Sequence, residues 1–295
     1  MTTEEARFLD TDLGPVFMIA TGDESATKSA VVCSGGWYVG STNANRVLIR
    51  LARAIAGLGY RSARFDWHGA GQSPGHVERF SLGEPFGDDV VAVAKELGGP
   101  TTLVGVCFGS RCALEAAQHL DDLEALVLVS FPFPVGGTRT KRADQLGARD
   151  AVRSAFRPEV VKGLLDPNAR RLYWKWVTLK WRAVKKRLFP SKAAPAKRVR
   201  EKVADQTMSI PQLVKEVNAL VQRDVRVLFL YGDSDGHYDH FAESAQEGPL
   251  AQLLERAGDR IAVHPVSGDL SGFATLESQE RMISEITGWM APRDR

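Results

Sequence analysis

The sequence lacks several features that would place the protein in a particular class. Its 295 residues include only 3 cysteines, an odd number without disulfide or zinc-binding spacing. No uninterrupted apolar run approaches the roughly 20 residues that a membrane-spanning helix needs. Residues 1–5 are polar and acidic, unlike a signal peptide. We therefore expect a cytoplasmic protein, because a reducing compartment suits unpaired cysteines.

The sequence also has little that predicts a cofactor. Gly69 and Gly71 match part of a dinucleotide-binding fingerprint. The third glycine of that fingerprint is missing, however, and the following Ser73 and Pro74 do not begin a helix. A tight turn explains these glycines better. We expect neither a cofactor nor a bound metal.

The net charge of +2 hides an uneven distribution. Residues 139–202 contain 20 Lys and Arg against 5 Asp and Glu, so the rest of the chain is acidic. After Pro134 the pattern also changes from alternating strands and helices to a basic, tryptophan-rich and helical one. The sequence therefore predicts a core, residues 1–134 and 208–295, with an inserted basic helical cap, residues 135–207.

Apolar runs and amphipathic stretches alternate along the core. Strands are expected at 16–20, 29–33, 60–65, 101–106, 123–130, 225–231 and 260–266. Helices are expected at 45–58, 86–97, 111–120, 210–221, 249–257 and 277–290. A continuous apolar strand is typical of a sheet that is covered on both faces. The pattern predicts an α/β fold, with an open and mostly parallel sheet flanked by helices.

The sequence Gly105-Val106-Cys107-Phe108-Gly109 is the most informative motif. It follows an expected strand and begins an expected helix, as a nucleophile elbow does. Glycines two positions before and after the nucleophile are needed because a Cβ there would collide with the neighbouring strand or helix. Cysteine occupies the apex, where serine is usual.

Four segments together resemble the α/β-hydrolase family, and the resemblance covers almost all of the chain outside the insertion. They follow expected strands in the family's order, at 33–37, 65–73, 105–109 and 231–235. The first resembles the oxyanion loop and the second the D-x-x-G-x-G-x-S turn. The third is the elbow, and the fourth resembles the loop that carries the acid of the catalytic triad. The resemblance implies an α/β-hydrolase fold and a hydrolase or acyltransferase activity.

The resemblance assigns the nucleophile and the groups that stabilise an oxyanion. Cys107 is at the nucleophile position. The backbone N–H of Phe108 would be one oxyanion donor, and that of Gly36 or Trp37 would be the other. A thiolate is the reactive form of cysteine, and the first turn of the following helix favours a negative charge.

The resemblance also assigns the acid of the triad, but it leaves the base uncertain. Asp235 is at the acid position, with Asp233 as the second choice. The family places its histidine just after the last strand, where this chain has Asp269 or Leu270. His237 and His240 follow the acid loop and are the candidate bases.

No histidine follows His264, and the loss affects a cysteine less than a serine. A free thiol already gives a few per cent thiolate at neutral pH, whereas a hydroxyl needs a base. Hydrolysis of an acyl-enzyme suffers more, because water must be deprotonated. The working hypothesis is an acyltransferase or thioesterase that acts on an acyl ester or thioester through acyl-Cys107. The alternative is a catalytically silent binding protein that retains the pocket.

The basic insertion contains an apolar stripe with helical spacing. The stripe consists of Trp174, Val177, Trp181, Val184 and Leu188. Three interpretations remain open. The helix packs over the site, with Trp174 and Trp181 against the substrate. It binds an anionic partner, either the phosphates of coenzyme A or an acidic acyl carrier protein. It lies on an anionic membrane surface. Binding to nucleic acid is not expected, because no recognition motif accompanies the charge.

Overall fold

The computed structural model describes most of the expected core. The described residues are 3–36, 39–75, 86–133, 208–270 and 275–291. All of their helices and strands belong to the unit formed by Met1–Val135 and Gln206–Arg295. The expected cap, residues 135–207, lies outside the described residues together with Trp174 and Trp181, so its structure stays a prediction.

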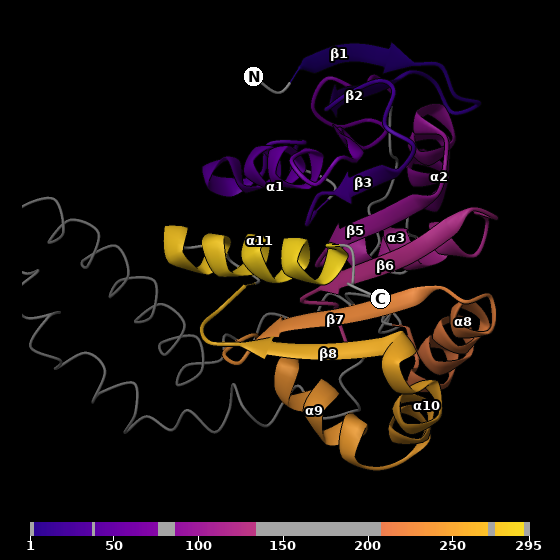
Figure 1. The fold of residues 1–295 in the computed structure, drawn as a ribbon, viewed down its shortest axis with the longest axis vertical. Helices are drawn as coiled ribbons and strands as arrows, with labels where there is room; N and C mark the ends of the chain where they lie inside the picture. Colours follow the sequence, from indigo (N-terminus) through magenta and orange to yellow (C-terminus); the bar gives the residue numbers. More distant parts are fainter. Residues whose placement is uncertain (1–2, 37–38, 76–85, 134–207, 271–274, 292–295) are drawn as a thin grey trace, which may run out of the picture. The chain divides into compact units, whose positions relative to one another are not determined.

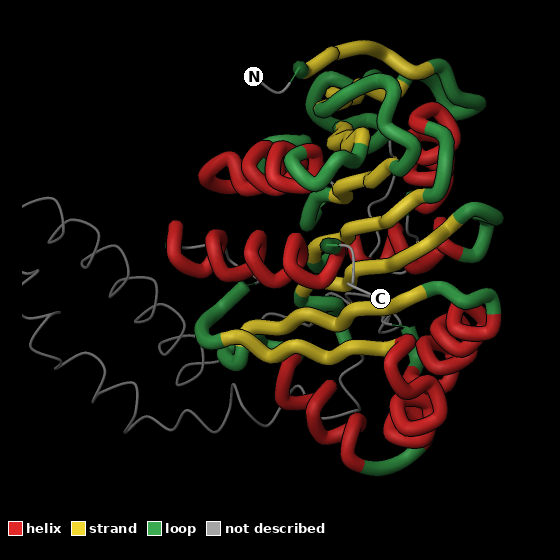
Figure 2. Tube along the Cα trace, in the orientation of Figure 1, coloured by secondary structure: helices red, strands yellow, loops and turns green. Residues whose placement is uncertain are grey.

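Eight strands form one sheet in the order β1-β2-β4-β3-β5-β6-β7-β8 (Figures 1 and 2). The strands are β1 (Glu4–Leu9), β2 (Val16–Thr21), β3 (Ser29–Cys33), β4 (Arg61–Phe65), β5 (Thr101–Val106), β6 (Leu123–Val129), β7 (Arg226–Gly232) and β8 (Ile261–Val266). β2 is antiparallel to β1 and β4, and every other pair is parallel.

Helices cover both faces of this sheet. The α-helices are α1 (Val47–Ala56), α2 (Gly87–Leu97), α3 (Phe108–Ala117), α8 (Ile210–Gln222), α9 (Tyr238–Gln246), α10 (Pro249–Ala257) and α11 (Leu276–Met290). Short 3-10 helices occur at Ala44–Arg46 and Gly258–Arg260. α1 and α11 lie against one face, and α2, α3 and α8 lie against the other (Figure 1). α10 packs beside α8 and α9.

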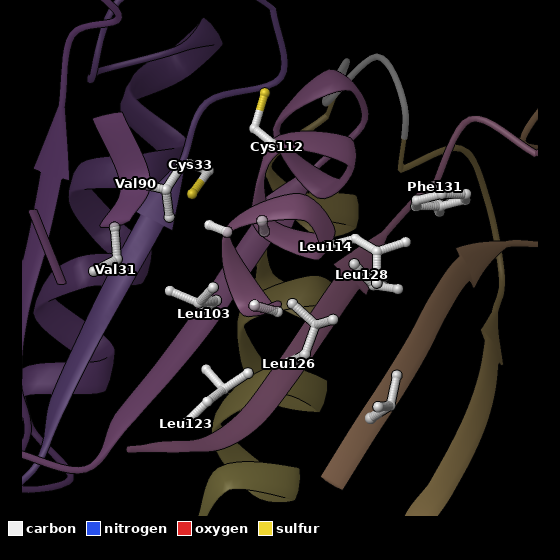
Figure 3. Close-up of a cluster of buried hydrophobic side chains, with 14 of the residues drawn as sticks. Val31, Cys33, Val90, Leu103, Cys112, Leu114, Leu123, Leu126, Leu128 and Phe131 are labelled. Atoms are coloured by element: carbon white, nitrogen blue, oxygen red, sulfur yellow. The ribbon is translucent and has the colours of Figure 1, made fainter. Parts of the chain in front are cut away.

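The buried side chains of β6 divide between the two faces. Leu126 and Leu128 belong to the core beneath α3, whereas Val127 and Val129 belong to the core beneath α11. Leu114 of α3 lies over the first pair (Figure 3). The β6 residues that face either side of the sheet are apolar because helices cover both faces, as the continuous apolar run predicts.

The structure confirms the predicted fold class, and every predicted strand and helix has a counterpart within a few residues. α3 begins at Phe108 rather than Arg111. The sequence patterns missed β1 and α9. β1 is a charged edge strand whose residues are at least partly exposed, and α9 buries only Phe241, so neither has a strong apolar periodicity.

The sheet topology places the site at the carboxyl ends of β3 and β5. The chain passes from β3 to β4 on one side and then returns past β3 to β5. Such a reversal opens a crevice at the carboxyl ends of the two strands, where ligands bind in open α/β sheets. Cys33 pairs with Gly105 at these ends, so the residues that follow the two strands are neighbours.

The start of α3 fits closely against the end of β3. A Cβ on Gly109 would lie 2.5 Å from the carbonyl oxygen of Ser34 and 2.6 Å from that of Cys33. Backbone atoms cannot move aside as a flexible side chain can. The close approach therefore requires glycine at position 109.

We predict that Gly109→Ala lowers the free energy of unfolding by about 1–3 kcal/mol, the usual cost of forcing extra atoms into a packed core. Gly288→Ala is the matched control, because Gly288 lies within α11 and a Cβ there meets nothing within 4 Å. Alanine is the better helix former, so this control should gain up to about 1 kcal/mol. Urea denaturation measures both changes, and equal stabilities of the two variants would contradict the prediction.

Candidate active site

Cys107 is the apex of a sharp turn between β5 and α3. Its backbone has φ 47° and ψ −114°, a strained conformation for a residue other than glycine. The Cys107 N–H donates to the carbonyl oxygen of Val129 at 2.8 Å, which fixes the turn to β6. A Cβ on Gly105 would lie 2.5 Å from the carbonyl oxygen of Gly109. The geometry is therefore the elbow that the motif predicts, with both glycines required.

Phe108 directs a backbone donor at the Cys107 sulfur. Its N–H hydrogen-bonds to that sulfur and lowers the pKa of the thiol. Its buried ring packs edge-on against Trp67 and Phe86, with ring centroids 5.9 Å apart in both pairs. The aromatic contacts thus hold in place the N–H that was expected to stabilise an oxyanion.

The Cys107 thiol nevertheless has a raised pKa. Burial is the main cause, and the nearby Asp235 carboxylate raises the pKa further. These effects outweigh the Phe108 N–H, whereas the sequence suggested that the helix terminus would favour a thiolate. The resting residue is therefore a thiol. Cys33 and Cys112 are buried in the core, as the sequence predicted (Figure 3).

The expected oxyanion loop lies against the elbow. The Ser34 hydroxyl accepts from Trp67 Nε1 at 2.6 Å and donates to the carbonyl oxygen of Val39 at 2.8 Å. The Gly36 carbonyl oxygen accepts from the Val39 N–H at 2.9 Å, and Gly36 is buried. Trp37, the other candidate donor, lies outside the described residues.

The D-x-x-G-x-G-x-S segment has a structural role. The Asp66 carboxylate accepts the Ser41 N–H at 2.6 Å and the Gln72 N–H at 2.9 Å. Gly71 has φ +58°, and a Cβ there would collide with the Asp66 carboxyl group. The glycines therefore form the tight turn that the sequence predicted. This turn also supports Trp67, which holds the oxyanion loop.

Asp235 is buried at the carboxyl end of β7 and has several hydrogen-bond partners. Its Oδ2 accepts the Ser130 hydroxyl and the Gly232 N–H, the latter at 2.9 Å. Its Oδ1 accepts the Leu270 N–H at 2.7 Å. Since Asp235 also affects the Cys107 thiol electrostatically, the structure brings the predicted acid and the predicted nucleophile into one site.

The loop after β8 lies directly against the acid loop. The Ser234 N–H donates to the Gly268 carbonyl oxygen at 3.1 Å, and the Gly268 N–H donates to Asp233 Oδ1 at 2.9 Å. The Asp269 side chain hydrogen-bonds to Asp235. Burial raises the pKa of Asp235, the Ser130 hydroxyl lowers it, and Asp269 raises it again.

The candidate bases His237 and His240 lie at the start of α9, which follows the acid loop. His240, on the first turn of α9, has Nδ1 3.9 Å from Glu243 Oε2. His237 precedes α9, and its carbonyl oxygen accepts the Phe241 N–H. His264 is on β8, where its Nδ1 is 3.1 Å from Glu285 Oε2. The assignment of His237 or His240 as the base stays a prediction.

Ser130 and Asp269 are site residues to which the sequence assigned no role. Ser130 directly follows β6 with φ 46°, and its hydroxyl donates to Asp235. The sequence named Asp269 only as one of two residues, with Leu270, at the expected histidine position. The available signal for both was their position in the chain. Ser130 directly follows β6, which pairs with the elbow strand β5, and Asp269 lies shortly after β8, which pairs with β7 before the acid loop.

Neither a metal cluster nor a membrane span occurs in the described part of the chain. It contains no group of three or more His, Cys, Asp or Glu side chains that could hold a metal ion. None of its helices is both long and apolar enough to cross a bilayer.

Solved structures of low sequence identity share this fold. An α/β serine hydrolase without a lid, XC6422 from Xanthomonas campestris, has a TM-score of 0.51 at 16% identity, with 99% of this chain and 97% of that chain covered. The Pyrococcus furiosus esterase Pf2001 has a TM-score of 0.56 at 13% identity, with 98% and 91% covered. A serine hydrolase homologue from Coxiella burnetii has 0.54 at 14%, with 97% of each covered.

A search of curated protein sequences gives no match. The family model described as "Alpha/beta hydrolase family" matches residues 30–269, which include the oxyanion loop, the elbow, the acid loop and Asp269. With the elbow geometry and the sheet order, this match establishes that the chain belongs to the alpha/beta hydrolase family.

Proposed function

We propose that the protein cleaves or transfers the acyl group of an ester or thioester through a covalent acyl-Cys107 intermediate. The observation that carries the proposal is the thiol at the elbow apex, with the Phe108 N–H directed at its sulfur. A thiol in this position can attack a carbonyl carbon while a backbone donor lies beside it. Family membership and the esterase and hydrolase neighbours support hydrolytic chemistry of this general class.

The reaction would begin with loss of the thiol proton as sulfur attacks the carbonyl carbon. The carbonyl π electrons move to oxygen, and the N–H groups of Phe108 and of Gly36 or Trp37 stabilise the resulting negative charge. Collapse of this intermediate expels the alcohol or thiol and leaves an acyl-cysteine. We propose that Asp235 and either His237 or His240 accept the thiol proton and return it to the leaving group. Water or a second nucleophile then accepts the acyl group.

We predict that p-nitrophenyl acetate acetylates Cys107. Intact-protein mass spectrometry should detect one added acetyl group, and peptide mapping should place it on residue 107. Cys107→Ala should abolish the adduct, whereas Cys112→Ala should retain it, because Cys112 is buried in the core. An unmodified Cys107 after prolonged incubation would contradict the proposed function.

The raised pKa of Cys107 gives a second prediction. Only the thiolate reacts with iodoacetamide, so the alkylation rate should rise with a midpoint above the ordinary value of about 8.5. Asp235→Asn removes a negative neighbour and should shift the midpoint to lower pH. Glu247→Gln, which removes an exposed carboxylate at the end of α9, is the matched control and should leave it unchanged. A wild-type midpoint below 7 would contradict the prediction.

A catalytically silent binding protein is the second candidate function. Two observations favour it: the raised pKa of the Cys107 thiol, and the absence of histidine from the sequence that follows β8. The acetylation experiment separates the candidates. A silent protein would bind an ester substrate or its analogue in equilibrium dialysis without forming the adduct.

The basic segment, residues 139–202, is proposed to bind the anionic portion of a thioester substrate in the cytoplasm. Coenzyme A carries phosphates, and an acyl carrier protein carries acidic side chains, so either would be attracted electrostatically. A helix packed over the site and contact with an anionic membrane are the other interpretations of this segment.

We predict that kcat/KM for acetyl-coenzyme A exceeds that for the uncharged acetyl-N-acetylcysteamine by about tenfold at low salt. The advantage should shrink as ionic strength rises from about 0.01 to 0.5 M, because salt screens exposed charges. Steady-state assays of free thiol release measure both rates. A salt-independent ratio near one would contradict coenzyme A recognition and leave the acyl-cysteine chemistry untouched.

A further inference from the structure

Arg111 is a buried charge that the reaction at Cys107 does not use. It is the fourth residue of α3, the helix that begins directly after Cys107, and only 6% of it is exposed. Its Nε is fully buried and has no hydrogen-bond partner. An arginine keeps its proton in a protein, so a partner is needed to offset the cost of removing the charge from water.

The carboxylates that could pair with Arg111 are bound to other groups. Glu115, one helical turn further along α3, accepts the Gly87 N–H at 3.1 Å. Glu216 of α8 accepts from Gln212 Nε2 at 2.9 Å. Both attract the Arg111 guanidinium, but no carboxylate in the described part of the chain forms an ion pair with it within 4.0 Å. The guanidinium therefore has attraction at a distance without a direct anionic contact.

Arg7 and Arg64 show how other arginines of this molecule are neutralised. Their Nε atoms also lack a partner. A terminal nitrogen of Arg7 is nevertheless 2.6 Å from Glu96 Oε1, and one of Arg64 is 3.7 Å from Glu4 Oε2. Arg111 has no such carboxylate beside it, so the missing anion is a property of its position between α3 and α8.

The two helices hold Arg111 close to the level of the elbow. Arg223, at the end of α8, donates to the carbonyl oxygens of Ala117 and Leu120 at the end of α3, so the carboxyl ends of the two helices are fixed together. Arg111 lies four residues after Cys107, which is about 6 Å along the helix axis. An acyl group on Cys107 therefore needs only a few carbon atoms to come level with Arg111.

We infer that Arg111 binds a carboxylate at the far end of the substrate's acyl group, so that the protein acts on esters or thioesters of dicarboxylic acids. The inference rests on the proposed acyl-Cys107 chemistry and names the class of acyl group. A guanidinium and a carboxylate form paired, charge-assisted hydrogen bonds. Glu115 and Glu216 repel any anion from a distance, which favours a singly charged carboxylate in direct contact over a dianionic phosphate.

The test compares two nitrophenyl esters that differ by one charge. Mono-p-nitrophenyl glutarate ends in a carboxylate, whereas its methyl ester is neutral. The first should acylate the wild-type Cys107 about 10- to 100-fold faster, the factor that hydrogen bonds to a charged group usually give. Arg111→Met should remove this preference, because methionine fills the site without a charge. Release of nitrophenolate, at subsaturating ester, measures the four rates.

Matched variants separate a specific contact from a general effect of charge. Arg256, on α10, is exposed, so Arg256→Met changes the net charge equally and should keep the preference. Arg111→Lys keeps the charge without the paired geometry and should keep only part of it. A preference that Arg111→Met leaves intact, or that Arg256→Met removes equally, overturns the inference. Absence of acylation by every ester contradicts the proposed function instead.

Thermal unfolding tests the site without any reaction at Cys107. An unpaired buried charge destabilises a fold, so Arg111→Met should raise the Tm of the ligand-free protein. Glutarate, compared with sodium chloride at equal ionic strength, should raise the Tm of the wild type but not that of Arg111→Met. If Arg111→Met lowers the ligand-free Tm, or if glutarate stabilises both proteins equally, Arg111 has only a structural role and the inference fails.

Discussion

The close approach of the β5–α3 turn to the end of β3 is the constraint on which the site depends. Gly109 leaves no room for a side chain beside the carbonyl oxygens of Cys33 and Ser34. Through this contact the elbow and the oxyanion loop lie directly beside each other. Cys107 then adopts a left-handed φ because the chain must turn from a buried strand into a helix within one residue. The strain is maintained by backbone hydrogen bonds to β6 and by the rings of Phe108, Trp67 and Phe86.

The electrostatics of the site determine the protonation of its nucleophile. Burial and Asp235 together keep Cys107 as a thiol. A protonated nucleophile must lose its proton as it attacks a substrate carbonyl. Such an arrangement suits thiol chemistry better than hydroxyl chemistry, because a thiol loses its proton several orders of magnitude more readily.

Much of the fold could be predicted from the sequence, because strands buried on both faces leave a clear apolar pattern. The elbow could also be located, since any chain that makes this turn needs glycine at these two positions to avoid a clash with the backbone, here Gly105 and Gly109. β1 and α9 could not be predicted, because each buries too few side chains to produce an apolar periodicity. The contact between Asp235 and Asp269 connects two loops distant in sequence, and only the register of β7 with β8 brings them together. The sequence could not show the raised pKa of the Cys107 thiol either, because the burial that raises it depends on the whole packed core.

Ser130 has a consequence for how the insertion can vary. The chain leaves β6 at this residue, whose hydroxyl binds Asp235. The next residues are also anchored, since the Phe131 carbonyl oxygen accepts the Tyr231 hydroxyl and the Phe133 ring packs against Phe241 of α9. The chain is thus fastened to the acid strand and to α9 up to residue 133. Changes of sequence or length within residues 134–207 can therefore leave the hydrogen bonds of Ser130 and Phe131 in place.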